Sequence, residues 1–296
     1  MLFRSLTVNA APAITAQPVS TSVCAGAVAS FAVTATGTGL HYQWKKNGVD
    51  VGTDAASYSL TTVSGDNGAA ITVVVTGACS PAATSTAAVL TVNAAPSITA
   101  QPVSTSVCAG AVASFAVTAT GTGLHYQWKK NGLNVGTDAS SYSLATVAGD
   151  DGATITVVVT GACSPAATST AATLTVNQAP AITAQPVSTS VCAGAVASFA
   201  VTATGTGLHY QWKKNGLDVG TDAASYSLTT VAGDNGATIT VVVTGTCSPA
   251  ATSTAAVLTV NAAPSITAQP VSTSVCAGAV ASFAVTATGD RKSTRL

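Results

Sequence analysis

The residues best suited to chemistry recur at a single spacing. Histidine occurs three times, always within the stretch HYQWKKNG, as His41, His125 and His209. An imidazole can bind a metal ion or transfer protons. However, copies 84 residues apart fall in separate domains, roughly 35–40 Å from one another. We therefore expect one solvent-facing histidine per repeat and no metal cluster built from them.

Cysteine follows the same period. Two occur in each repeat and one is left over: Cys24 and Cys79, Cys108 and Cys163, Cys192 and Cys247, then Cys276. Neither a Cys-x-x-Cys motif nor a Cys/His ligand spacing is present, so we expect no zinc site. Two cysteines per domain predict disulfides formed in an oxidising, extracellular compartment. Free reactive thiols are the alternative.

No other motif predicts catalysis. The sequence lacks a nucleophile elbow, a paired acid and base, a phosphate-binding glycine loop and a dinucleotide fingerprint. The run Asp66-Asn67-Gly68 lacks the spaced acidic ladder of a calcium loop and is typical of a turn. Lys45 and Lys46 flank a hairpin and are expected to be solvated. We predict no catalytic, cofactor-binding or metal-binding residue, no cofactor and no enzymatic activity.

The composition restricts partners and fold class. Only 7% of the 296 residues are charged, every acidic residue is Asp, and the formal net charge is zero. We therefore expect no binding of nucleic acid or of an anionic membrane. No apolar run approaches the roughly 18 residues of a membrane span. The 47% hydrophobic content argues against disorder, and the abundance of Ala, Thr, Val, Ser and Gly favours strands and tight turns over helices.

The period of 84 residues predicts the domain organisation. Complete repeats occupy residues 11–94, 95–178 and 179–262, and the first and third differ at four positions. A fourth repeat, 263–289, breaks off after about a third of its length, and by itself it is too short to bury a core. Residues 1–10 contain the tail of a preceding repeat behind an unrelated start.

The two ends of the sequence match translations of opposite strands of one oligonucleotide. DRKSTRL, at 290–296, is encoded by GATCGGAAGAGCACACGTCTG, a common sequencing adapter. Leu2 to Ser5 are encoded by CTCTTCCGATCT, whose reverse complement overlaps that string. We expect residues 1–5 and 290–296 to be adapter-derived, and the rest to be an internal piece of a longer array. Without those ends, six lysines accompany nine aspartates, a net charge of −3.

Alternating apolar and polar residues predict about seven short strands per repeat. Asn47-Gly48 supplies the positive-φ pair of a tight hairpin between two of them. In the first repeat the expected strands cover residues 14–23 in two parts, then 27–35, 41–45, 49–51, 58–60, 71–75 and 87–92.

This pattern resembles the immunoglobulin-like domains found in tandem in bacterial secreted and cell-surface, adhesin-type proteins. The resemblance covers each full repeat, and it is carried by Gly26, Trp44 in the third strand, the Asn-Gly hairpin, Leu60, Val63 and residues 71–75. It implies an all-β fold of tandem immunoglobulin-like antiparallel β-sandwiches. The inter-sheet cysteine positions of antibody domains fall on Val33 and Val73, so packed aliphatic side chains are expected to replace that bridge.

The aromatic residues of HYQWKKNG are expected in the core rather than in a ligand site. Tyr42 and Trp44 share one face of a strand, and the resemblance places an inward Trp between the two sheets, against Val33 and Val73. The alternative is an exposed aromatic pair that stacks on sugars. The predicted structural core comprises Val33, Val73, Tyr42, Tyr126, Tyr210, Trp44, Trp128 and Trp212.

The same mapping bears on the cysteines. It places Cys24 at the bottom of its sandwich and Cys79 at the top, some 20 Å apart and beyond the roughly 7 Å Cα separation that a disulfide can span. The bottom of one repeat meets the top of the next. We therefore hypothesise bridges between repeats, Cys24–Cys163 and Cys108–Cys247. Bridges within repeats, Cys24–Cys79, Cys108–Cys163 and Cys192–Cys247, stay open as the alternative.

Repetition itself favours a structural function. Short, Pro-containing linkers such as Val92-Asn-Ala-Ala-Pro96 predict restricted swing and a rod of roughly 110 Å. We expect a non-enzymatic stalk or spacer segment of a bacterial extracellular or surface adhesin-like protein. The alternatives are a multivalent module in which each repeat recognises a surface glycan or a protein, and a spacer array within a large secreted enzyme.

Overall fold

The computed structural model describes residues 7–289, so the two predicted adapter-derived ends, 1–5 and 290–296, lie outside the described residues. By internal contacts the chain forms two compact units. The first unit reaches to Thr105 and also includes Ala113–Leu144 and Gly152–Leu174. The second includes Ser106–Val112, Ala145–Asp151 and the chain from Thr175 on. The first repeat thus lies within the first unit, and the third repeat within the second.

The described residues contain strands and short 3-10 turns, with no α-helix among them. The first repeat consists of β1 (Ala13–Ala16), β2 (Thr21–Cys24), β3 (Val28–Ala32), β4 (Thr34–Thr36), β5 (His41–Lys46), β6 (Val49–Val51), β7 (Ser57–Thr61), η1 (Ser64–Asp66), β8 (Ala69–Thr76), β9 (Ala83–Thr84) and β10 (Ala88–Asn93). Within residues 7–289 no helix is long and apolar enough to cross a membrane.

The later repeats have the same elements at the same repeat positions. The second has β11 (Ser97–Ala100), β12 (Thr105–Cys108), β13 (Val112–Ala116), β14 (Thr118–Thr120), β15 (His125–Lys130), β16 (Leu133–Val135), β17 (Ser141–Ala145), η2 (Ala148–Asp150), β18 (Ala153–Thr160), β19 (Ala167–Thr168) and β20 (Ala172–Asn177). The third has β21 (Ala181–Ala184), β22 (Thr189–Cys192), β23 (Val196–Ala200), β24 (Thr202–Thr204), β25 (His209–Lys214), β26 (Leu217–Val219), β27 (Ser225–Thr229), η3 (Ala232–Asp234), β28 (Ala237–Thr244), β29 (Ala251–Thr252) and β30 (Ala256–Asn261). They are followed by β31 (Ser265–Ala268) and β32 (Thr286–Thr288).

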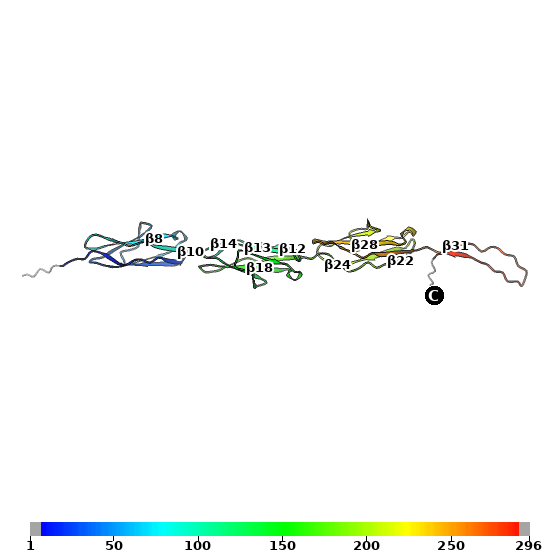
Figure 1. Cartoon of the computed structure of the whole chain (residues 1–296), viewed down its shortest axis with the longest axis horizontal. Helices are drawn as coiled ribbons and strands as arrows, with labels where there is room; N and C mark the ends of the chain where they lie inside the picture. Colours follow the sequence, from blue (N-terminus) through cyan, green and yellow to red (C-terminus); the bar gives the residue numbers. More distant parts are fainter. Residues whose placement is uncertain (1–6, 290–296) are drawn as a thin grey trace, which may run out of the picture. The chain divides into compact units, whose positions relative to one another are not determined.

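The first repeat is a two-layered sandwich (Figure 1). One layer has the strand order β2-β10-β8-β5-β6, with β9 paired to β8, and the other is made of the ladders β1-β4 and β3-β7. The pairings are antiparallel except that of β2 with β10, which is parallel. The predicted all-β immunoglobulin-like sandwich is confirmed at this level, with β9 and the small β4 as strands that the residue pattern did not separate.

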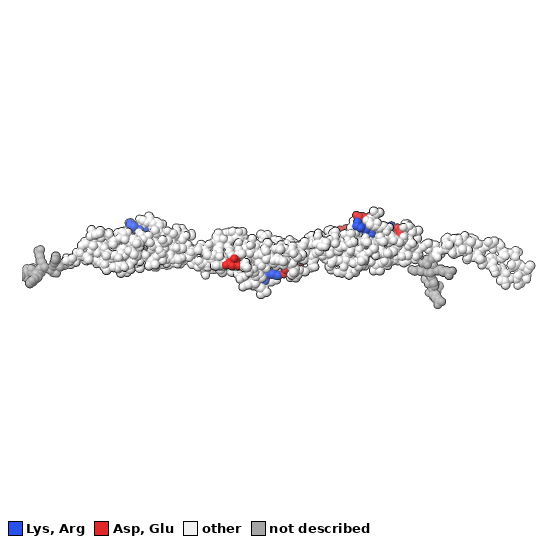
Figure 2. Space-filling model, in the orientation of Figure 1, with Lys and Arg blue, Asp and Glu red and all other residues white. Residues whose placement is uncertain are grey.

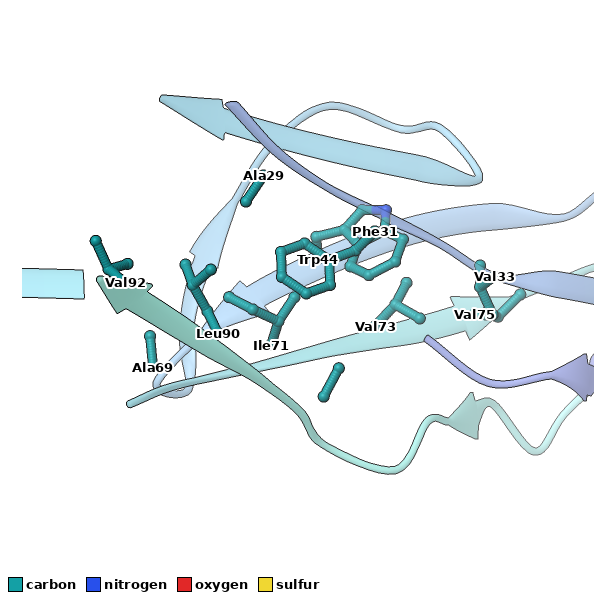
Figure 3. Packing of buried hydrophobic residues seen from close by; sticks show 11 residues of the cluster. Ala29, Phe31, Val33, Trp44, Ala69, Ile71, Val73, Val75, Leu90 and Val92 are labelled. Atoms are coloured by element: carbon teal, nitrogen blue, oxygen red, sulfur yellow. The ribbon is translucent and has the colours of Figure 1, made fainter. Parts of the chain in front are cut away.

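Alternation of side chains explains why these strands form two facing layers. Along β8 every second residue is buried, from Ala69 through Ile71 and Val73 to Val75, because successive side chains of a strand point to opposite faces. The buried side chains of β3 meet them from the opposite layer, with Phe31 almost fully buried. Figure 3 shows this packing around the indole of Trp44.

The third repeat, in the second unit, is built in the same way. Its large sheet has the order β22-β30-β28-β25-β26, and β23 pairs with β27. Its buried cluster contains Phe199, Trp212 and Val241 at the positions of Phe31, Trp44 and Val73. The two nearly identical sequences therefore give the same core in separate units.

Candidate functional site: the junctions between repeats

A disulfide joins the first repeat to the second inside the first unit. Cys24 ends β2, and the parallel ladder places it opposite Asn93 of β10. Cys163, in the loop that follows β18, forms a disulfide with Cys24, with a Cα–Cα distance of 5.8 Å across a sequence separation of 139 residues. The Cys163 sulfur lies 3.6 Å from the carbonyl oxygen of Asn93. The bridge is therefore built beside the last residue of the last strand of the first repeat.

The linker at this junction is held by backbone hydrogen bonds. Ala94 N–H donates to Thr122 Oγ1 at 3.1 Å, and Thr122 N–H donates back to the Ala94 carbonyl at 3.1 Å. The N–H of Ala162, the neighbour of Cys163, donates to the Thr122 carbonyl at 2.8 Å. Gly121 has φ +143°, and a Cβ there would lie 3.0 Å from Pro96 Cα. A larger residue at Gly121 would therefore crowd Pro96 and displace the end of the linker.

The second junction repeats this arrangement inside the second unit. Cys108 is bonded to Cys247, again at a Cα–Cα distance of 5.8 Å, and the Cys247 sulfur lies 3.6 Å from the Asn177 carbonyl oxygen. Gln178 N–H donates to Thr206 Oγ1 at 3.1 Å. The structure contains the hypothesised pairing between repeats and not the alternative pairing within repeats.

Three cysteines in the described range are not bridged: Cys79, Cys192 and Cys276. Cys79 occupies the loop position of the bridged Cys163 and Cys247, and its sulfur lies 3.4 Å from the Asn9 carbonyl oxygen. Cys192 and Cys276 are exposed and occupy the β2-end position. The unbridged cysteines therefore occupy the same two kinds of position that the disulfides join, namely the loop position of Cys163 and the strand-end position of Cys24.

Each repeat also contains a histidine–aspartate pair. The Nδ1 of His41 lies 2.6 Å from Asp54 Oδ2, and Tyr42 N–H donates to Asp54 Oδ1 at 2.7 Å. The hydrogen bond to His41, with that of the Tyr42 backbone, lowers the pKa of Asp54. The histidine is solvent-facing, with 70% of its side chain exposed. Sequence reasoning missed Asp54, although a Thr-Asp pair follows the histidine at the same distance in every repeat.

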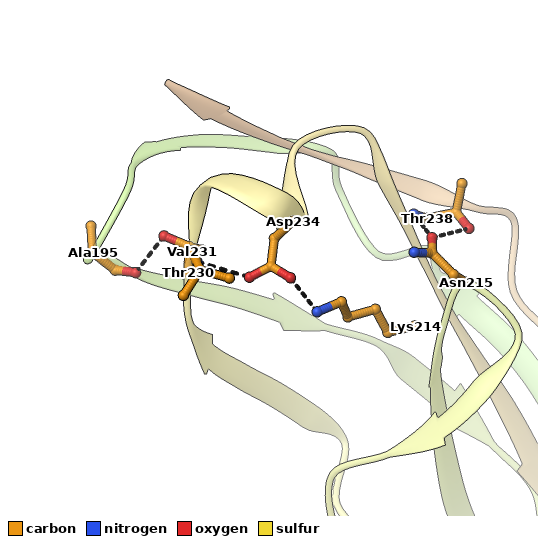
Figure 4. A network of polar contacts seen from close by, with 7 residues as sticks. All are labelled: Ala195, Lys214, Asn215, Thr230, Val231, Asp234 and Thr238. Carbon is orange, nitrogen blue, oxygen red and sulfur yellow. Dashed lines mark hydrogen bonds and ion pairs between the residues drawn. The ribbon is translucent and has the colours of Figure 1, made fainter. Parts of the chain in front are cut away.

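Lys46, which was expected to be solvated, keeps 31% of its side chain exposed but is held by an ion pair. Its ammonium group forms an ion pair with Asp66, a buried carboxylate in η1. The other oxygen of Asp66 accepts the Val63 N–H at 2.9 Å. The Lys46 hydrogen bond and then the Val63 backbone bond lower the pKa of Asp66. Figure 4 shows the same network in the third repeat, where Lys214 and Val231 hold Asp234.

The turn interpretation of Asp66-Asn67-Gly68 agrees with this geometry. Both carboxylate oxygens of Asp66 are occupied, and Asn67 Oδ1 accepts the Val92 N–H at 3.0 Å. Asp66 thus ties the turn to Lys46 of β5 and to Val63, and Asn67 ties it to β10. Residues 7–289 contain no group of three or more His, Cys or Asp side chains placed to hold a metal ion. Charged residues are sparse on the face drawn in Figure 2.

The structure places the predicted core residues as follows. Trp44, Trp128, Trp212 and Val73 have no exposed surface, and Val33 is 5% exposed. Tyr42, Tyr126 and Tyr210 are only half-buried. Tyr42 and Tyr210 pack against the buried clusters of their repeats, so for the tyrosines the core prediction holds only in part.

The ring partner of Trp44 was missed by sequence reasoning. Trp44 stacks on Tyr58 of β7, with ring centroids 6.0 Å apart, and its Nε1 donates to the Ala55 carbonyl at 2.8 Å. Val73, opposite Trp44 on β8, belongs to the same buried cluster as Val33. The indole therefore joins the two sheets and the loop before β7.

Comparison with known proteins bears on the fold alone. No protein-family model matches the sequence, and no curated protein matches it. Among solved structures, the I-band fragment I67-I69 from titin is similar, with a TM-score of 0.66 and 15% identity over 85% of this chain and 99% of that one. An E-to-A variant of those titin domains gives a TM-score of 0.65 at 16% identity, with the same coverage. The chain thus has the fold of tandem immunoglobulin-like domains.

Proposed function

We propose that this chain is a non-enzymatic spacer segment of a bacterial extracellular or cell-surface protein of the adhesin type. Its domains are the repeats 11–94, 95–178 and 179–262, with 263–289 as the start of a fourth. The support comes from the copied sandwich and from the disulfides Cys24–Cys163 and Cys108–Cys247. Disulfides of this kind persist in oxidising compartments, which favours an extracellular location.

The observation that supports this function most directly is that both disulfides connect neighbouring repeats. Neither of them bridges the two sheets of one sandwich. Each sandwich already has a core closed by a buried indole, so an internal staple is not needed. A bond across a junction, added to the linker between the repeats, limits the swing of one domain against the next. Limiting swing is useful to a spacer, which must hold what it carries away from a surface.

Small-angle X-ray scattering tests this function. The oxidised chain should give a larger maximum dimension and a narrower distance distribution than a variant lacking both bridges, Cys24→Ser with Cys108→Ser. The matched control is Cys79→Ser, which removes an unbridged thiol and should leave the scattering unchanged. Identical curves for the bridged chain and the variant lacking the bridges would contradict the spacer function.

The binding-module alternative has less support at HYQWKKNG. His41 is paired with Asp54, and the Gln43 amide donates to the carbonyls of Trp44 and Val51 at 3.0 and 3.2 Å. These outward groups are already engaged by the protein itself. We expect a glycan-array screen of the chain to be negative. Micromolar binding that disappears in His41→Ala or Gln43→Ala would establish recognition by this strand in place of a spacer role.

A further inference from the structure

Thr62 is a polar side chain that the first repeat buries. Only 1% of its surface is exposed, and a buried hydroxyl costs free energy unless it forms a hydrogen bond. Its Oγ1 lies 3.1 Å from the carbonyl oxygen of Cys24 and 2.9 Å from that of Ala27, so its single proton is shared between two acceptors. The Thr62 N–H also donates to the Ala27 carbonyl at 2.9 Å, and the Thr62 carbonyl accepts the Gly26 N–H at 2.7 Å. One residue, placed directly after β7, therefore holds the turn of residues 24–27.

This turn carries one cysteine of the bridge between the first two repeats. Cys24 ends β2, and the Ala27 N–H closes the turn on the Cys24 carbonyl at 3.0 Å. The disulfide with Cys163 has a Cα–Cα distance of 5.8 Å, whereas two cysteines more than roughly 7 Å apart cannot be joined. A displacement of the turn by little more than about 1 Å away from the loop of the second repeat would therefore take Cys24 out of reach.

The other two repeats contain the same contact. Thr146 Oγ1 lies 3.1 Å from the carbonyl oxygen of Cys108, and Thr230 Oγ1 lies 3.1 Å from that of Cys192. Both threonines are as deeply buried as the first, at 2% and 1% exposed. Cys108 forms a bridge to the next repeat, whereas Cys192 is not bridged. The third repeat therefore has the threonine contact without the disulfide, and it separates the effect of the hydroxyl on the fold from its effect on a bridge.

We propose that Thr62 and Thr146 are positioning residues for the disulfides between repeats, a role that rests on the same bridges as the spacer function. When such a bridge forms, one cysteine thiolate attacks glutathione disulfide, and one glutathione leaves as a thiolate. The thiolate of the second cysteine then attacks the resulting mixed disulfide and expels the second glutathione. The threonine acts on this second step, because it holds the strand-end cysteine close to the loop cysteine while the two are not yet joined.

The test equilibrates the full chain in glutathione redox buffers, traps free thiols by alkylation and measures the bridged fraction by mass spectrometry. Trypsin cuts after the lysine pairs of the three HYQWKKNG stretches, so each bridge joins a different pair of peptides. Thr62→Val keeps the shape of the side chain and removes the hydroxyl. It should lower the equilibrium constant of the Cys24–Cys163 bridge about two- to tenfold, the effect of one hydrogen bond, and leave Cys108–Cys247 unchanged. Thr62→Ser, which restores the hydroxyl, should restore the constant.

The matched control is Thr230→Val, which removes the same buried hydroxyl beside an unbridged cysteine and should leave both constants unchanged. An unchanged Cys24–Cys163 constant in Thr62→Val, or an equal loss in Thr230→Val, would overturn the positioning role and leave the spacer function standing. A chain in which neither bridge forms would contradict both.

A second variant reaches the same turn from its exposed side, in case Thr62→Val prevents the first repeat from folding. Gly26 has φ +85°, and a Cβ there would meet no atom within 4 Å, so Gly26→Ala strains the turn without a steric clash. The unbridged chain can relax this strain by moving the turn, so the Cys24–Cys163 constant should again fall. Gly194→Ala, at the same position of the third repeat with φ +86°, should change neither bridge. Equal constants for Gly26→Ala and Gly194→Ala would show that the position of this turn does not govern the bridge.

Discussion

Trp44 shows how one side chain closes each sandwich. Its indole has no exposed surface, stacks on Tyr58 and donates its N–H to the Ala55 carbonyl. A buried indole N–H without an acceptor would cost free energy, so the loop before β7 must pass beside the ring. The residue therefore fixes both the distance between the sheets and the course of this loop.

Trp44→Ala should destabilise the first repeat by about 3–5 kcal/mol, because it leaves a large cavity. Urea denaturation followed by circular dichroism should show about a third of the signal moving to a lower midpoint. Val49→Ala alters a side chain that is 68% exposed and should change stability by no more than about 0.5 kcal/mol. Equal midpoints for the two variants would mean that the indole does not support the core.

The Lys46–Asp66 pair predicts a pH dependence. The pKa of Asp66 is lowered from its ordinary value of 3.8, as is that of Asp234. The carboxylates therefore stabilise the fold above that value, and their contribution is lost as pH falls through the lowered pKa. Asp66→Asn with Asp234→Asn should melt at a lower temperature than the unmodified chain at pH 7, and the gap should shrink below about pH 4. Thermal melts that keep a constant gap down to pH 2 would contradict this role.

At the scale of elements, the β5–β6 hairpin connects the core strand to the edge of the large sheet. Asn47 and Gly48 have φ values of 51° and 82°, the positive pair that a two-residue hairpin turn needs. Asn47 Oδ1 also accepts the Ala70 N–H at 2.9 Å. The turn is therefore tied to the start of β8 and sets the register of β5 against both neighbouring strands.

Gly48→Ala should cost about 1–2 kcal/mol, because an L-residue is strained at this φ. A Cβ at Gly48 would meet no atom within 4 Å, so strain is the only expected cause. Gly65 has equally open surroundings and no positive φ, and Gly65→Ala should not destabilise. Chemical denaturation of both variants measures the difference, and an equal cost would point to a cause other than φ.

At the scale of the whole molecule, the two bridges overlap in sequence. Cys24–Cys163 and Cys108–Cys247 each span 139 residues, and residues 108–163 are enclosed by both. Tension applied at the ends would pass through the bonds instead of along the full backbone. The overlap means that unfolding a repeat would release only part of its length.

Single-molecule stretching from the two ends measures this effect. With both bonds intact, the shortest covalent path contains about 130 of the 296 residues, so the oxidised chain should reach about 440 Å against about 1,000 Å after reduction. Cys79→Ser should not change the oxidised length. A full extension without reductant would show that the bridges between repeats are not formed.

Several features of the molecule follow from local sequence alone. The period of 84 residues gives the repeats, the alternation along β3 and β8 predicts two half-buried layers, and Asn47-Gly48 predicts the hairpin. Strand parity puts Trp44 on the same face as Tyr42, and its inward position was implied by the resemblance to immunoglobulin-like domains. These properties depend on neighbours in the chain, which the sequence displays directly.

Other features were decided only by the tertiary structure. The choice of Cys163 as partner of Cys24, the stacking of Tyr58 on Trp44, and the ion pair of Lys46 with Asp66 join residues far apart in the chain. A side chain's type shows what it could bond, but distances across sheets and junctions determine which partner it meets. Those distances are set by the packing of the layers, which a one-dimensional pattern does not contain.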